Sequence, residues 1–121
     1  MEMTEARIQQ DSIVWFRNNY CLKHHIPQFV IFSVPNEGRD VVEQMKKKAT
    51  GMLKGVSDTI IVLKNKTIYC EFKDNKGKQK PDQIMFQIKV TELGHEYWLV
   101  RSLEEFQLKV WDELGILNEE L

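Results

Sequence analysis

A chain of 121 residues is long enough for one domain with a single hydrophobic core and too short for two, so we expect one domain over residues 1–121. Hydrophobic residues make up 42% and charged residues 29% of the chain, as in ordinary globular proteins, and no apolar run approaches the about 20 residues of a membrane-spanning helix. The acidic N-terminus lacks the apolar core of a signal peptide, which predicts an intracellular, cytoplasmic protein without membrane contact.

The first part of the chain carries a helical pattern and then a strand pattern. Thr4 can cap a helix that runs to about Tyr20, because apolar residues recur there at helical spacing. Residues 28–34 alternate and are rich in β-branched side chains, which predicts a strand, and the sequence Pro-Asn-Glu-Gly over 35–38 is a turn signal. Helical spacing returns over about 39–53, where we expect a second helix.

A pair of strands and a polar loop follow. Apolar and β-branched residues predict strands at about 56–63 and 67–73, joined tightly around Asn65. Residues 74–80 are polar and lysine-rich, which is typical of a loop.

The last third of the chain contains two helices and one strand. Pro81 suits the first turn of a third helix, which Gly94 ends. Residues 95–100 predict a short strand, and a final helix over 102–115 opens with a Ser-x-x-Glu capping box. The resulting order, αβαββαβα, is typical of a mixed α/β sandwich.

The lysines are concentrated in one segment. Between Lys46 and Lys80 there are ten lysines and three acidic residues, whereas the rest of the chain holds seven basic and fifteen acidic residues. This asymmetry, within a net charge of −1, indicates a face that attracts phosphates, with a merely solvated lysine-rich surface as the alternative. The candidate DNA-binding residues are Lys46, Lys47, Lys48, Lys76, Lys78 and Lys80.

Charged residues gather at one end of the predicted hairpin. Glu71 and Lys73 are two apart on a strand and leave the same face, whereas Phe72 points into a core. If residues 65–66 form a two-residue turn, Asp58 lies opposite Lys73 and shares that face. A slip of one residue would move Asp58 to the other face unless a bulge restored it.

Further polar residues extend the apolar stripes of two helices. Glu5 and Gln9 continue the stripe of the first helix, and Gln83 continues that of the third. Each alone is explained by a half-exposed helix end. Together with the hairpin cluster they favour a shared polar site.

The chemistry of this cluster fits hydrolysis of a phosphodiester. Carboxylates such as Asp58 and Glu71 are hard oxygen ligands that suit Mg²⁺ or Mn²⁺, and a bound metal polarises a phosphoryl oxygen and acidifies water. A nearby lysine, here Lys73, can stabilise the developing negative charge. The pattern Asp-x(n)-Glu-x-Lys is weak evidence for such a site on its own. It becomes more informative because it lies on a predicted hairpin between flanking helices.

The sequence resembles the VRR-NUC family, a branch of the PD-(D/E)XK nuclease superfamily. The similarity follows nearly the whole chain in order, and the combination is more specific than any single piece. The matching segments are Glu5-x-x-x-Gln9, Val34-Pro35-Asn36-Glu37-Gly38, Leu53-Lys54-Gly55-Val56-Ser57-Asp58, Glu71-Phe72-Lys73, Gly77-Lys78-Gln79-Lys80-Pro81-x-Gln83, and Gly94-His95 leading to Leu99-Val100-Arg101-Ser102. The chain departs from the superfamily pattern at Ser57, where proline is frequent, and at Lys80, where a small residue is common.

The resemblance implies a restriction-endonuclease-like core, with a mixed central sheet flanked by helices, and a set of roles. The implied metal ligands for Mg²⁺ or Mn²⁺ are Asp58, Glu71, the Phe72 backbone carbonyl and, as a further candidate, Glu5; Lys73 is the implied catalytic lysine, supported by Gln83 and Glu5. The implied activity is a DNA endonuclease. Lone members of the family are similar to resolvases of branched DNA from phages and bacteria.

Resolving a four-way junction needs two symmetric cuts, so we expect a homodimer with two active sites. The two terminal segments carry more apolar residues than the helices need for their own core, and these could form an interface: Val14, Trp15, Trp111, Leu114, Ile116, Leu117 and Leu121. The alternative is that these residues close the core of the monomer.

The sequence allows three alternatives to this prediction. A DNA-binding or dimerisation module with the same fold but no catalysis is less favoured because Asp58, Glu71 and Lys73 are all intact. RNA as the substrate stays open. Cys21-x-x-His24, with His25 and His95, could form a zinc site. This alternative is less favoured because no second Cys/His pair follows at metal spacing.

Overall fold

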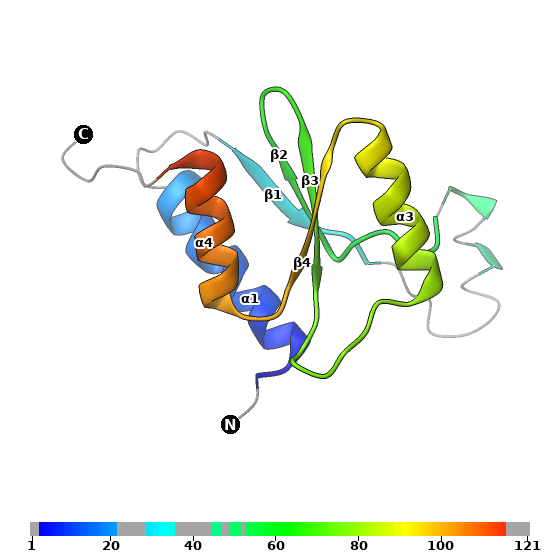
Figure 1. Cartoon of the computed structure of the whole chain (residues 1–121), viewed down its shortest axis with the longest axis horizontal. Helices are drawn as coiled ribbons and strands as arrows, with labels where there is room; N and C mark the ends of the chain where they lie inside the picture. Colours follow the sequence, from blue (N-terminus) through cyan, green and yellow to red (C-terminus); the bar gives the residue numbers. More distant parts are fainter. Residues whose placement is uncertain (1–2, 22–28, 36–44, 47–48, 52, 116–121) are drawn as a thin grey trace.

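The helices and strands of the described residues follow one another in the predicted order (Figure 1). The structure is a computed structural model, and it describes residues 3–21, 29–35, 45–46, 49–51 and 53–115. The elements are α1 (Glu5–Phe16), η1 (Arg17–Cys21), β1 (Val30–Ser33), β2 (Thr59–Val62), β3 (Thr67–Phe72), α3 (Pro81–Glu92), β4 (Glu96–Val100) and α4 (Leu103–Leu114). In the described part of the chain, no helix combines the length and apolar character needed to cross a membrane.

A mixed sheet forms the centre of the molecule. Its strand order is β1-β2-β3-β4; the first three strands are antiparallel, and β4 runs parallel to β3 after the crossover through α3. Helices α1 and α4 lie on one face of the sheet and α3 lies on the other (Figure 1). This arrangement confirms the predicted α/β fold with a mixed central sheet flanked by helices.

The main core lies between the sheet and the α1–α4 pair. Phe72 on β3 is fully buried there and packs against Phe106 of α4, with ring centroids 5.9 Å apart. Burying each large apolar side chain contributes about 1.5–3 kcal/mol to folding. Because Phe72 points into this core, as predicted, its neighbours Glu71 and Lys73 project from the opposite, α3-facing side of the sheet.

Several element boundaries differ from the prediction. The first helix keeps α-helical geometry only to Phe16 and continues as the π-helical turn η1, where the Asn19 side chain donates to the Trp15 carbonyl oxygen at 2.8 Å. A side chain that takes a backbone acceptor in this way disturbs regular helical bonding. The helix predicted over 39–53 falls mostly outside the described residues. Leu93, the C-cap residue of α3, is 68% exposed.

The register of the β2–β3 hairpin corrects one prediction. The Leu63 amide donates to the Lys66 carbonyl oxygen at 2.9 Å, so the turn is Lys64-Asn65 and not residues 65–66. Thr59 is therefore paired with Cys70, and extending this register by one residue places Asp58 opposite Glu71 rather than opposite Lys73. Moving the turn by one residue changes the register by two, so Asp58 keeps the predicted face.

Candidate active site

Asp58 and Glu71 lie side by side where β2 begins and β3 ends. Asp58 stands one residue before β2, and its carboxylate oxygen Oδ2 accepts a hydrogen bond from the Phe72 backbone N–H at 3.0 Å. Its carbonyl oxygen accepts from the Val34 N–H at 2.8 Å, just beyond β1. Asp58 is thus fixed by both neighbouring strands, with its carboxylate beside that of Glu71.

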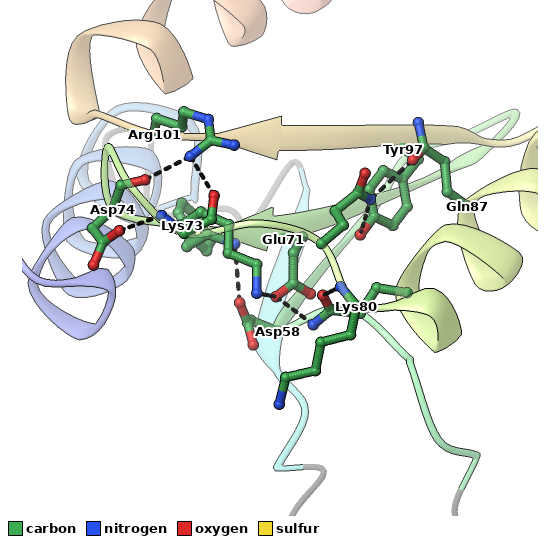
Figure 2. Close-up of polar contacts among 12 residues, drawn as sticks. Asp58, Glu71, Lys73, Asp74, Lys80, Gln87, Tyr97 and Arg101 are labelled. Atoms are coloured by element: carbon green, nitrogen blue, oxygen red, sulfur yellow. Dashed lines mark hydrogen bonds and ion pairs between the residues drawn. The ribbon is translucent and has the colours of Figure 1, made fainter.

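Lys73 completes the cluster (Figure 2). Glu71 is 2% and Lys73 7% exposed, and the Lys73 Nζ lies 3.7 Å from Glu71 Oε2. The Lys73 backbone N–H donates to the Val100 carbonyl oxygen at 2.9 Å, so the parallel pairing with β4 holds this strand end in place. The structure therefore brings together the three residues that the sequence singled out.

Gln83 joins the cluster from α3. It occupies the first turn of the helix, where its Oε1 accepts from the Lys80 backbone N–H at 2.8 Å. Its Nε2 donates to Glu71 Oε2 at 3.1 Å. One side chain thus caps α3 and orients the carboxylate, which agrees with its predicted place at the site.

A close backbone approach fixes α3 beside the segment that leads to Asp58. Gly55 has φ +92°, and a Cβ atom there would lie 2.4 Å from the Asp82 carbonyl oxygen. Only glycine fits such a contact at this φ. The Lys54–Asp82 ion pair, at 3.5 Å, spans the same junction.

The electrostatics of Glu71 fit a cation site. Burial, followed by the charge of Asp58, raises the pKa of Glu71 to about 8, and Lys73 only partly opposes this shift. Within the described residues, Glu71 Oε1 is buried and accepts no hydrogen bond. A buried oxygen without a donor beside a second carboxylate is the environment that a divalent cation would stabilise.

The ligand set would be small. Across the described ranges, no group of three or more His, Cys, Asp or Glu side chains is arranged to hold a metal. Asp58 and Glu71, with the Phe72 carbonyl that the family resemblance implies, could hold a Mg²⁺ or Mn²⁺ ion that keeps several of its waters, as these ions commonly do.

Glu5 borders the cluster at the stem of Lys73. It is exposed at the start of α1, and its Oε1 is 3.2 Å from the position that a Cβ on Gly77 would take. The same position is 3.2 Å from Cδ of Lys73, so Glu5 borders the lysine stem. Its negative charge adds to the effects that raise the pKa of Glu71.

The lysines between Lys46 and Lys80 do not all lie near the site. Lys66, at the hairpin turn and so at the opposite end of β3 from Glu71, forms ion pairs with Glu96 and Glu113. Lys54 pairs with Asp82, and Lys73 is buried in the cluster. The exposed candidates next to the site are Lys76, Lys78 and Lys80; Lys46 is also exposed, and Lys47 and Lys48 lie outside the described residues.

Several residues at the site received no role from the sequence. Arg101 binds the backbone of the loop after Lys73, and Asp74 accepts two amides of that loop (Figure 2). Gln79 donates to Gln87 at 2.9 Å and to the hydroxyl of Tyr97 at 3.2 Å. The available signal was an arginine directly after an apolar strand and an Asp-x-x-Gly segment directly after Lys73.

The zinc alternative finds no support in the described part of the chain. The Cys21 thiol donates to the Phe29 carbonyl oxygen at 3.0 Å, and His95 Nδ1 accepts from the Thr67 N–H at 3.1 Å. His24 and His25 lie outside the described residues.

The four-stranded mixed sheet with helices on both faces has the arrangement of a restriction-endonuclease-like core. A solved structure of a "VRR_NUC domain protein" matches it with a TM-score of 0.73, covering 98% of this chain and 95% of that chain at 17% identity. No protein-family model and no curated protein matches the sequence. The structural similarity confirms the fold that the resemblance to VRR-NUC proteins implied.

Proposed function

We propose that this protein is a DNA endonuclease that uses Mg²⁺ or Mn²⁺ to hydrolyse phosphodiester bonds, with branched DNA as its preferred substrate. The observation that carries the proposal is the buried carboxylate of Glu71 beside the half-buried Asp58, with Lys73 next to it and one Glu71 oxygen without a donor among the described residues. A chain gains no stability from burying one carboxylate beside a second, so such a pair is expected where function requires it.

Each residue would have a defined task in this reaction. Asp58, Glu71 and the Phe72 carbonyl would hold the metal ion, which when bound polarises the phosphoryl oxygen and acidifies water. Lys73 would stabilise the negative charge that develops on the phosphoryl group. Gln83 would keep Glu71 oriented through its hydrogen bond.

A panel of labelled substrates tests the proposal directly. Duplex, single strand, flap and four-way junction are incubated with Mg²⁺, with Mn²⁺ or with EDTA. We expect metal-dependent cleavage, fastest on branched substrates. Absence of cleavage on every substrate would favour the catalytically inactive DNA-binding module, and calorimetric titration would then show little Mn²⁺ binding. An RNA arm decides between the two nucleic acids.

Phosphate contacts from the exposed loop lysines should make binding strongly salt-dependent. Each phosphate that is neutralised adds about −0.9 to the slope of log K against log salt for duplex DNA. We expect replacement of Lys76, Lys78 and Lys80 with alanine to flatten this slope by about 2–3, similarly for unrelated sequences. Fluorescence anisotropy at several salt concentrations measures it.

A matched variant removes three lysines elsewhere. Lys64, Lys89 and Lys109 lie outside the candidate DNA-binding set, and their replacement with alanine changes the net charge equally. If the two triple variants shift the slope alike, the loop lysines act only through overall charge.

We expect a homodimer, because paired cuts in a junction need two sites. In the protomer, the rings of Trp15 and Trp111 pack edge to face with centroids 5.8 Å apart, so both side chains already have a packing partner within one chain. Val14, in contrast, is exposed. Residues 116–121 lie outside the described ranges. Sedimentation at micromolar concentration should give twice the mass of the chain; a monomer that still cuts junctions in pairs would contradict the prediction.

A further inference from the structure

Arg101 stands at the junction between β4 and the lysine-rich loop. Its Nη1 donates to the carbonyl oxygens of Asp74 and Gly77, both at 2.7 Å (Figure 2). These two carbonyls bracket the start of the loop that follows Lys73. One guanidinium nitrogen thus holds both ends of a four-residue segment.

The same segment is fixed from inside by Asp74. Its Oδ1 accepts the backbone N–H of Lys76 at 2.9 Å and that of Gly77 at 2.6 Å. Asp74 therefore satisfies amides of the turn, and Arg101 satisfies carbonyls. A short loop with both kinds of backbone group paired is held in one conformation.

Arg101 is itself held firmly. Its backbone N–H donates to Glu105 Oε1 at 2.8 Å, and the Glu105 N–H donates to Ser102 Oγ at 3.1 Å at the start of α4. The preceding residue, Val100, is fully buried and pairs with the strand that carries Lys73. The position of the guanidinium thus derives from β4 and α4 rather than from the loop.

The anchored loop touches the reactive cluster. A Cβ on Gly77 would lie 3.2 Å from Cδ of Lys73, so the loop backbone packs along the stem of this lysine. The loop also carries the exposed lysines that the proposed function assigns to phosphate binding. Its conformation therefore affects both Lys73 and the path of the DNA.

We propose that Arg101 is a positioning residue for cleavage, because its guanidinium fixes the loop that supports Lys73 and presents the phosphate-binding lysines. This inference rests on the proposed nuclease function. Because both hydrogen bonds go to neutral carbonyls, the role depends on the reach and geometry of the side chain. A residue that only added positive charge would act on DNA affinity alone.

The test compares R101M, R101K and K64M with the wild type. K64M removes one charge at the hairpin turn, at the other end of β3. We expect R101M to lower the single-turnover cleavage rate at saturating DNA by about 10- to 100-fold, because small displacements of catalytic groups have effects of this size. K64M should keep the wild-type rate. R101K keeps the charge but not the guanidinium, so its rate should also fall.

A second readout does not need activity. Amide hydrogen exchange of Lys76 and Gly77, measured by NMR without DNA, should become at least about tenfold faster in R101M and also faster in R101K, with K64M unchanged. Wild-type exchange in both Arg101 variants would overturn the proposal, as would a wild-type rate at saturating DNA with weaker affinity only. If the wild type cleaves no substrate, the proposed function fails, and the exchange experiment still decides whether Arg101 anchors the loop. If R101M does not fold, R101K decides both readouts.

Discussion

Replacement of Asp58, Glu71 or Lys73 with alanine is expected to reduce cleavage by about a thousandfold or more in each case. Residues that act as one catalytic unit lose nearly all activity when any one is removed, and their effects are not additive. The shared geometry supports this expectation, because Lys73 Nζ lies 3.7 Å from Glu71 Oε2 and Asp58 stands opposite Glu71. Single-turnover cleavage of a labelled junction with Mg²⁺ measures the loss.

The variants must also be compared for folding. Asp58→Ala leaves the Phe72 N–H without its acceptor, which costs about 1–3 kcal/mol in a buried setting. Asp58→Asn keeps an oxygen at this place and separates loss of charge from loss of structure. Glu92→Ala, at an exposed position on α3, is the matched control and should cleave at the wild-type rate. Cleavage by Glu71→Ala above a few per cent of wild type would refute the assignment of the site.

Much of the fold follows from local patterns in the sequence. The α4 helix begins where the Ser-x-x-Glu pattern placed it, and the Ser102 hydroxyl accepts from the Glu105 N–H. The alternation in β3 correctly put Phe72 in the core and Glu71 on the opposite face. Patterns with a period of two or about four residues encode which side of an element is buried, and this information is local.

The parts that escaped prediction depend on contacts between distant residues. The alternation of apolar and polar residues predicts the face of Asp58 but not the residue opposite it, because registers that differ by two residues give the same faces. The turn at Lys64-Asn65 sets the register that the structure has. The anchoring of Gly77 by Arg101 joins residues 24 positions apart and has no local pattern. The concentration of lysines between Lys46 and Lys80 does not show which of them lie near the site, because the hairpin places Lys66 at the opposite end of β3 from Glu71.

Glu71→Gln is expected to stabilise the protein in EDTA by about 1–3 kcal/mol while removing cleavage. Glu71 is almost fully buried beside Asp58, and its Oε1 has no hydrogen-bond donor in the described structure. Neutralising one carboxylate of such a pair removes repulsion and a desolvation cost. A substitution that raises stability and removes activity is expected where a residue that destabilises the fold is required for function. Urea unfolding monitored by circular dichroism measures the difference.

The stabilisation should depend on pH in a defined direction. The pKa of Glu71 rises from its ordinary value of 4.5 to about 8 in the folded chain, chiefly because of burial. Below about pH 4.5 the folded and unfolded states are both protonated, so no penalty exists. As the pH rises toward about 8, the unfolded state releases its proton first and the wild type loses stability relative to Glu71→Gln.

A pH series and a metal arm make this prediction decisive. The difference between the two proteins should grow from pH 5 to pH 8, whereas Glu92→Gln, at an exposed carboxylate, should follow the wild type throughout. Saturating Mn²⁺ at pH 8 should stabilise the wild type and have much less effect on Glu71→Gln, because an ion that binds only the folded state shifts the unfolding equilibrium. If Glu71→Gln is less stable than the wild type at pH 8 in EDTA, then the Glu71 carboxylate stabilises the fold. It is then not an unfavourably buried charge that a bound cation would compensate.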